Sequence, residues 1–217
     1  RSAAKAHKDG LLRDEIVAVN GNTLDNGVKG DSTLEKLSSL KPAFVKPHGT
    51  HTAGNSSFLT DGASAALLME ESVALKSGFT PKTRLLDWLF VSQDPKDELL
   101  LGPAYAIAKL LKKRGLTFKD IGVFELHEAF AGQVLANLNA LDSDVFFSRN
   151  LGGGFGSKLG KVPMDTLNTL GGSLSLGHPF GATGTRLLTT ASNRLQRENG
   201  KYALVAACAA GGQGVAM

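Results

Sequence analysis

The sequence predicts an α/β protein in which a mixed β-sheet lies between layers of helices. Short apolar runs, such as residues 202–207, alternate with stretches whose apolar residues recur at helical spacing, such as residues 103–114. Glycine or proline stands near the ends of most of these segments. The composition, 42% hydrophobic and 20% charged over 217 residues, is that of an ordinary globular domain. Alternating strands and helices pack most simply as a sheet covered by helices.

Residues 1–50 are polar and irregular, and we expect them to be the remnant of an N-terminal or loop domain. An alanine-rich stretch at residues 3–6 favours a helix, and residues 33–40 favour a second, short one. The pairs Asn20-Gly21 and Asn26-Gly27 form turns readily. The first residue is Arg1 rather than Met, so we expect the natural protein to begin upstream. Because this stretch has too few apolar residues for its own core, it must pack against other parts of the chain.

Residues 51–217 are expected to form one C-terminal domain. The apolar residues 63–69 fit a strand or a helix, and residues 70–76 fit a helix that ends before Gly78. A strand follows at residues 85–92, and then the helix of residues 103–114, which Gly115 ends.

The second half of this domain repeats the alternation. We predict a strand at residues 123–126, a helix at 129–141, a glycine-rich loop at 152–160 and a helix at 181–197. Residues 202–207 form an apolar strand of the fully buried type. The chain then stops at Met217 while entering a further strand.

Composition excludes several classes of protein. No apolar run approaches the roughly 20 residues of a membrane-spanning helix. The single cysteine, Cys208, rules out an internal disulfide and favours a reducing compartment. The net charge of +4 is dispersed, so nucleic-acid binding is not predicted. One cysteine and scattered histidines do not form a zinc site.

Three reactive side chains occupy comparable places in the predicted fold. His127 follows a strand, Cys208 closes one, and His178 lies in a loop just before a helix. Ligands of α/β sheets bind beside the carboxyl ends of the strands, so we expect these groups to meet there. Each has a simpler explanation: a hydrogen-bonded structural histidine, or a buried cysteine acting as a small apolar side chain. The dense glycines beside His178 and Cys208 favour a ligand site, because glycine lets backbone approach a ligand closely.

Four motifs, in order along the chain, resemble those of the thiolase family. Residues 52–57 (TAGNSS) are similar to the segment that opens the family's C-terminal domain. Residues 127–131 (HEAFA) resemble its Asn-Glu-Ala-Phe motif, and residues 177–184 (GHPFGATG) match its Gly-His-Pro motif. Residues 208–214 (CAAGGQG) resemble its C-terminal Cys-x-Gly-Gly-Gly-x-Gly. The resemblance implies a thiolase fold whose C-terminal domain has a mixed five-stranded sheet between helical layers, here without its final strand.

Two departures from the family pattern refine the resemblance. His127 stands in place of asparagine, and Ala210 in place of the first glycine after the cysteine. Both are similar to the subfamily that supplies the β subunit of the mitochondrial trifunctional complex of fatty-acid oxidation. This implies a mitochondrial enzyme that cleaves 3-ketoacyl-CoA with CoA, as a homodimer or tetramer. It also implies a candidate α subunit carrying hydratase and dehydrogenase activities, and at most peripheral membrane association.

The resemblance assigns a role to each of five residues. Cys208 is the acid and base that protonates the leaving enolate and deprotonates CoA. His178 activates the nucleophile and helps to bind the substrate oxyanion. His127 contributes to an oxyanion hole, and the Ala210 N–H serves a second one. Ser57 contacts CoA, which is a co-substrate; no cofactor and no metal is implied.

Thiolysis needs a second sulfur. Cys208 cannot be acylated and protonate the leaving enolate in the same step, so the nucleophilic cysteine is expected in an N-terminal half outside these residues. We expect the chain alone to be inactive. Three alternatives remain open: a non-catalytic CoA- or acyl-binding module or assembly subunit, a related ketoacyl synthase, and a hydrolase using Cys208 and His178. An upstream cysteine would separate the first of these from a thiolase.

Overall fold

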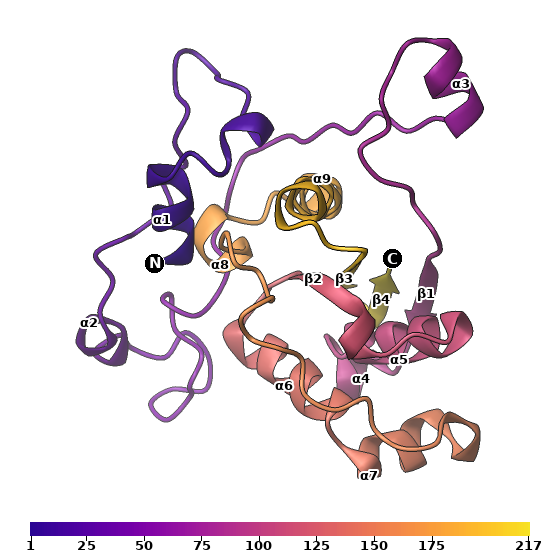
Figure 1. Ribbon diagram of the computed structural model, residues 1–217. Helices are drawn as coiled ribbons and strands as arrows, with labels where there is room; N and C mark the ends of the chain where they lie inside the picture. Colours follow the sequence, from indigo (N-terminus) through magenta and orange to yellow (C-terminus); the bar gives the residue numbers. More distant parts are fainter.

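The computed structural model describes residues 1–152 and 154–217, and a mixed four-stranded sheet lies at its centre (Figure 1). The strand order is β1-β4-β3-β2. Strands β2 and β3 are parallel, and β4 is antiparallel to both of its neighbours. The strands are β1 (Leu89–Ser92), β2 (Ile121–Leu126), β3 (Tyr202–Ala209) and β4 (Gln213–Ala216).

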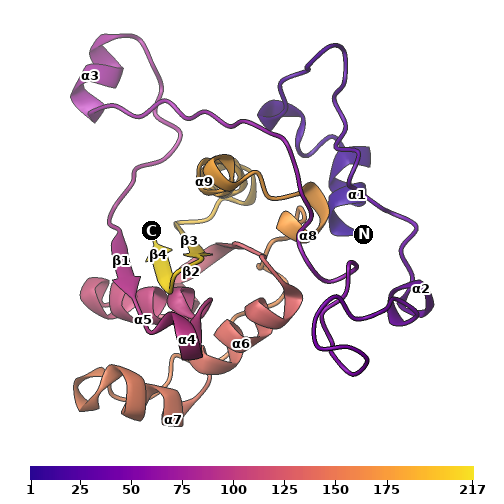
Figure 2. The ribbon, with the colours of Figure 1, turned by 180° about the vertical axis from the view of Figure 1, so that it is seen from behind.

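Two long helices cover opposite faces of this sheet (Figure 2). Helix α5 (Gly102–Arg114) packs on one face, where Phe124 of β2 and Leu204 of β3 join its buried side chains. Helix α9 (Phe180–Glu198) packs on the other, where Leu187 contacts the cluster that contains Val123 and Val205. Successive residues of a strand point to opposite faces, so β2 and β3 supply both cores. The predicted α/β class with helical layers on both faces of a mixed sheet is confirmed.

Local sequence explains where both helices end. Helix α5 ends at Gly115 and α9 at Asn199, and each of these caps has a left-handed conformation, with φ of 64° and 52°. The first residue of helix α5 is in close contact with strand β4. A Cβ on Gly102 would overlap the backbone of Gly214. Glycine at both positions lets the helix and the strand approach this closely.

The remaining helices are short and lie around this centre. They include α1 (Ser2–Lys8), α2 (Leu34–Ser38), α3 (Glu71–Lys76), α4 (Pro95–Glu98), α6 (Ala131–Leu141), α7 (Asp144–Phe146), a π-helix (Phe147–Leu151), α8 (Ser173–Leu176) and the 3-10 helices Arg13–Glu15 and Phe118–Asp120. The N-terminal stretch leans on the rest of the chain, as its composition predicts: Ala6 and Leu12 are buried against Leu170. No helix of the described residues is long and apolar enough to cross a membrane.

The structure corrects two predicted elements. Residues 63–69 are neither strand nor helix but an extended segment, with Leu67 72% and Leu68 64% exposed. Their apolar composition suited a strand, but a strand also needs a neighbour to pair with its backbone. The strand predicted at residues 85–92 begins only at Leu89, opposite Ala216 at the end of β4.

The sheet has four strands, which agrees in number with the predicted five-stranded sheet lacking one strand, but the missing strand is not the one at the end of the chain. The last strand is present as β4, and the Met217 backbone continues its pairing with Val205. Beyond β2, residues 166–168 run beside the sheet but form only one bridge, between Phe124 and Leu167. The ladder stops there because Asn168 turns to a φ of 46° and uses its side-chain amide, instead of its backbone, to bond both the N–H and C=O of Leu126.

Candidate active site

The carboxyl ends of β2 and β3 meet at one edge of the sheet, because the two strands are parallel. His127 follows β2 directly, and its backbone N–H donates to the Ala206 carbonyl of β3 at 2.8 Å. Cys208 lies two residues beyond Ala206, near the end of the same strand. The sheet therefore brings the backbone of His127 and of Cys208 to the same edge.

The imidazole rings of His127 and His178 lie against each other. Their centroids are 4.0 Å apart and their planes are inclined by 41°. His127 comes from the end of β2, and His178 from the loop between α8 and α9. The two rings are therefore adjacent, as expected, and their shared role in a functional site stays a prediction.

The loop that carries His178 is held by Thr60. The His178 N–H donates to the Thr60 hydroxyl at 3.2 Å, and this hydroxyl donates to the Phe58 carbonyl at 2.8 Å. Gly177 has a φ of 95°, and a Cβ there would overlap the Thr60 side chain. The glycine before His178 thus serves both the turn and the close approach of residues 58–60.

His127 is held as a neutral ring. Its side chain is buried, only 2% of the residue is exposed, and Nδ1 lies 3.0 Å from the Ser173 hydroxyl oxygen. Burial, with the nearby His178 and Arg186, lowers the pKa of His127 to about 3. At neutral pH the ring carries one proton, so one of its nitrogens donates and the other accepts.

The bonds around His178 leave its Nε2 free of a proton. Nδ1 lies 2.6 Å from the Thr183 hydroxyl oxygen, and Thr183 donates its own proton to the Pro179 carbonyl at 3.2 Å. A hydroxyl has one proton, so Thr183 accepts from Nδ1–H and the lone pair of the neutral ring lies on Nε2. Burial, and then the charge of Arg186, lower the pKa of His178. The arrangement suits a base.

Cys208 is a buried thiol with 9% of the residue exposed. Burial raises the pKa of Cys208 to about 11, so the group is protonated at neutral pH. A protonated thiol is a proton donor rather than a nucleophile. The meeting of this sulfur with the two imidazoles remains a prediction.

The other two predicted residues, Ala210 and Ser57, lie close in the chain or by hydrogen bond to the ends of β3 and β2. Ala210 is exposed in the turn between β3 and β4. That turn is fixed by Gln93, whose N–H donates to the Gly212 carbonyl at 2.8 Å. Ser57 is half-buried, and its N–H donates to the Ala129 carbonyl at 2.9 Å, two residues after His127.

An open groove of about 640 Å³ adjoins His178. Its walls are the extended segment of residues 59–64 and the loop and first turn of α9, residues 178–182. The Ser64 hydroxyl donates to the Ala182 carbonyl at 2.6 Å and ties the two walls together. Of the five predicted residues, His178 alone lines this groove within the described part of the chain.

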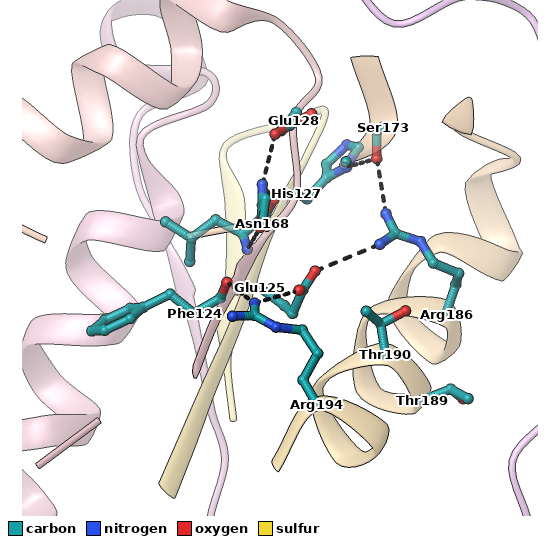
Figure 3. Close-up of polar contacts among 12 residues, drawn as sticks. Phe124, Glu125, His127, Glu128, Asn168, Ser173, Arg186, Thr189, Thr190 and Arg194 are labelled. Carbon is teal, nitrogen blue, oxygen red and sulfur yellow. Dashed lines mark hydrogen bonds and ion pairs between the residues drawn. The ribbon is translucent and has the colours of Figure 1, made fainter. Parts of the chain in front are cut away.

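Glu128, which sequence analysis did not single out, holds α8 against the end of β2 (Figure 3). Its carboxylate accepts from the Asn168 amide at 2.7 Å and from the Leu174 N–H at 3.2 Å. A Cβ on Gly172 would overlap this carboxylate, so any larger residue there would displace Glu128 from these bonds. The motif containing His127 and Glu128 and the one containing Gly172 and His178 are therefore joined by a direct contact.

A buried ion-pair network lies near His127, between β2 and α9 (Figure 3). Arg194 is fully buried, and its Nη1 donates to Glu125 at 2.8 Å, while its Nε donates to Glu198 at 2.8 Å. Arg186, two turns earlier on α9, lies 3.7 Å from the other oxygen of Glu125. The sequence indicates this network only weakly. Glu125 is a charged residue within the apolar strand β2, and Arg194 is a charged residue on the buried face of α9 that also carries Leu187 and Ala191.

The described residues contain no group of three or more histidine, cysteine, aspartate or glutamate side chains that could hold an ion.

The described residues form an α/β sheet with two adjacent histidines and a cysteine at its carboxyl edge, and comparison with known proteins identifies the family. The thiolase C-terminal domain matches residues 79–217, and the thiolase N-terminal domain matches residues 1–72. The chain belongs to the thiolase family.

Similar proteins agree with this assignment. A probable 3-ketoacyl-CoA thiolase of Caenorhabditis elegans is 62% identical over 221 residues, which cover 99% of this chain and 49% of the relative. The human mitochondrial trifunctional enzyme subunit beta is 58% identical over 219 residues. The match covers 99% of this chain and 46% of that relative. The crystal structure of human mitochondrial 3-ketoacyl-CoA thiolase in complex with CoA aligns with a TM-score of 0.81 at 34% sequence identity. The alignment covers 99% of this chain and 50% of the chain in that structure. The chain spans about half the length of these relatives.

Proposed function

We propose that the protein containing this chain is a 3-ketoacyl-CoA thiolase that uses CoA to release acetyl-CoA and a shortened acyl-CoA. The observation that carries the proposal is the pair of neutral imidazoles, 4.0 Å apart, at the sheet edge where a protonated thiol also ends its strand. The names of the similar proteins support it. Residues 1–50 then belong to the N-terminal or loop domain, and residues 51–217 to the C-terminal domain.

The reaction breaks a carbon–carbon bond and needs two sulfur groups on the protein. A thiolate attacks the 3-keto carbon, the C2–C3 bond breaks, and the electron pair leaves as the enolate of acetyl-CoA. The enolate takes up a proton, and CoA then attacks the acyl-enzyme thioester. Cys208 is the only cysteine in the chain. We therefore place the attacking sulfur in a segment outside these 217 residues.

Cys208 is the acid in this scheme. Its raised pKa keeps the proton available for the enolate, and the thiolate that remains can deprotonate the incoming CoA. His178 takes the proton of the attacking thiol on Nε2, because its Nδ1–H is engaged by Thr183. Each group returns to its starting protonation state after one turnover.

The remaining predicted residues bind charge and co-substrate. His127 donates to the oxyanion that develops on the substrate, and the Ala210 N–H serves a second oxyanion. Ser57 contacts CoA. The scheme uses no metal and no cofactor other than CoA as co-substrate.

The cellular setting is proposed from the relatives. The mitochondrial trifunctional enzyme subunit beta, 58% identical, supports a mitochondrial location and an α subunit with hydratase and dehydrogenase activities as a partner. We propose a homodimer or tetramer, with at most peripheral contact with a membrane and no role in nucleic-acid binding.

A product assay tests the proposed function. The full-length protein is incubated with medium- and long-chain 3-ketoacyl-CoA, with and without CoA, and the products are identified by mass spectrometry. We expect acetyl-CoA and an acyl-CoA two carbons shorter, only when CoA is present. Binding of CoA without turnover would instead indicate a non-catalytic module, and CoA-independent cleavage would indicate a hydrolase.

A further inference from the structure

Ser173 joins His127 to a buried arginine. Its hydroxyl oxygen lies 3.0 Å from His127 Nδ1 and 3.4 Å from Arg186 Nη2 (Figure 3). Ser173 is fully buried, and Arg186 is held beneath it by the charge of Glu125 at 3.7 Å. These groups connect β2, α8 and α9.

The chemistry of the three groups fixes the direction of each bond. A guanidinium only donates, so Arg186 donates to Ser173 Oγ. The single proton of Ser173 must then find an acceptor, and among the described residues His127 Nδ1 is the one within reach. If Nδ1 carried a proton instead, the buried hydroxyl of Ser173 would have no acceptor, at a cost of a lost hydrogen bond.

We propose that Ser173 and Arg186 are positioning residues that hold His127 in the tautomer with its proton on Nε2, so that this ring acts as a hydrogen-bond donor to the substrate. This deepens the proposed function and rests on it. His178 is held the opposite way, with its proton on Nδ1 by Thr183. Two adjacent, mutually tilted rings of the same residue type thereby supply one donor and one base.

The surroundings keep the donor neutral. Burial of the ring, and then the nearby His178 and the guanidinium of Arg186, oppose a second proton on His127 and lower the pKa of His127. A neutral ring has a single N–H, so its direction decides whether the ring donates or accepts. Asparagine, the usual residue of the family at this position, carries its own N–H and needs no such control.

Kinetics of two variants, alone and combined, test the proposal in the full-length protein. In the presence of His127 we expect Ser173→Ala to lower kcat about tenfold, the equivalent of one buried hydrogen bond, with KM unchanged. In a His127→Asn protein we expect Ser173→Ala to change kcat less than about twofold, because the amide has no tautomer to set. Equal losses in both backgrounds, or no loss with His127 present, would overturn the proposal.

Two further variants separate positioning from folding. Ser173→Thr keeps the hydroxyl and should retain most of the activity. Ser175→Ala is the matched control, since this serine lies on the same helix and its hydroxyl donates to the Gly172 carbonyl at 3.0 Å. A loss with Ser175→Ala equal to that of Ser173→Ala would reduce the effect to damage of α8.

Nitrogen-15 NMR of the histidine-labelled protein tests the tautomer in the unaltered wild-type site. We expect His127 to show a protonated Nε2 and a bare Nδ1, assigned by comparison with the His127→Asn protein. A protonated Nδ1 would refute the inference even if the protein is a thiolase. Absence of thiolysis with the expected tautomer would refute the proposed function instead.

Discussion

His127 and His178 face each other with ring centroids 4.0 Å apart, although 50 residues separate them in sequence. Each ring is tied through Nδ1 to a hydroxyl, of Ser173 for His127 and of Thr183 for His178. Both rings have lowered pKa values. Both rings are therefore uncharged at neutral pH. They can act on a substrate by hydrogen bonding and proton transfer rather than through a positive charge.

Removing the His127 ring should impair catalysis more than folding. We expect His127→Ala to lower kcat for thiolysis by about 10²–10³, the loss typical of one oxyanion donor. Steady-state kinetics of the full-length protein measure this. His7→Ala, which removes a histidine near the N-terminus that pairs with Asp25, should leave kcat unchanged. Native turnover in the His127→Ala protein would make the ring a spectator.

Burial of neutral His127 should make the fold less stable in acid. Its folded pKa of about 3 lies below the unfolded value of 6.5, so between these values the unfolded chain binds a proton that the folded protein does not. The free energy of unfolding should therefore fall as the pH drops below 6.5, by up to about 1.4 kcal/mol per pH unit for this group. Urea unfolding at several pH values measures the slope.

The matched variant for this slope is His127→Asn. It removes the titrating ring and leaves His178 in place, so its slope between pH 6.5 and pH 4 should be shallower. The same slope in both proteins would show that His127 does not contribute to the pH dependence.

Gly172 should not tolerate a side chain. Its Cβ would overlap the Glu128 carboxylate, which is held by Asn168 and by the Leu174 N–H. We expect Gly172→Ala to destabilise the fold by about 1–3 kcal/mol, as overpacking does. Gly184→Ala is the control: a Cβ meets nothing within 4 Å there, and alanine is favoured inside α9, so this variant should be as stable or more stable. Thermal melts compare the two.

The thiol of Cys208 should react slowly near neutral pH. With a pKa of about 11, its thiolate fraction at pH 7.5 is roughly two orders of magnitude below that of a free cysteine. We expect its alkylation by iodoacetamide, followed by peptide mass spectrometry, to be at least about 100-fold slower than that of the urea-unfolded protein. Comparable rates would show that the folded site does not raise the pKa.

Sequence analysis identified the two histidines because each stands in a glycine-rich or strand-end motif, and the structure joins them. It did not identify Ser173 or Arg186, because nothing near them in sequence indicates a contact with His127. Their roles come from the packing of α8 and α9 on β2, which spacing along the chain does not encode. Thr183 lies within the Gly-His-Pro motif, and only the first turn of α9 shows that it contacts His178.

The fold was predictable where periodicity was strong and not where pairing decided the outcome. Residues 103–114 agree closely with α5, because buried side chains at helical spacing and Gly115 both mark that helix. The prediction of a strand or a helix at residues 63–69 was wrong, because an apolar segment forms a strand only when another strand pairs with its backbone. The sheet ends beyond β2 because the side-chain amide of Asn168 bonds the backbone of Leu126. No motif or hydrophobic periodicity in the sequence around Asn168 predicts this contact.

Turnover of the full-length Cys208→Ala protein tests the proposed mechanism most directly, because the proposed acid is removed while the two imidazoles and the external nucleophile remain. Thiolysis of 3-ketoacyl-CoA is measured beside a melt that confirms folding. We predict that kcat falls by at least about 10²-fold, the contribution of a positioned general acid and base. Turnover close to that of the wild type would contradict the account, since the thiol of Cys208 would then have no part in cleaving the carbon–carbon bond.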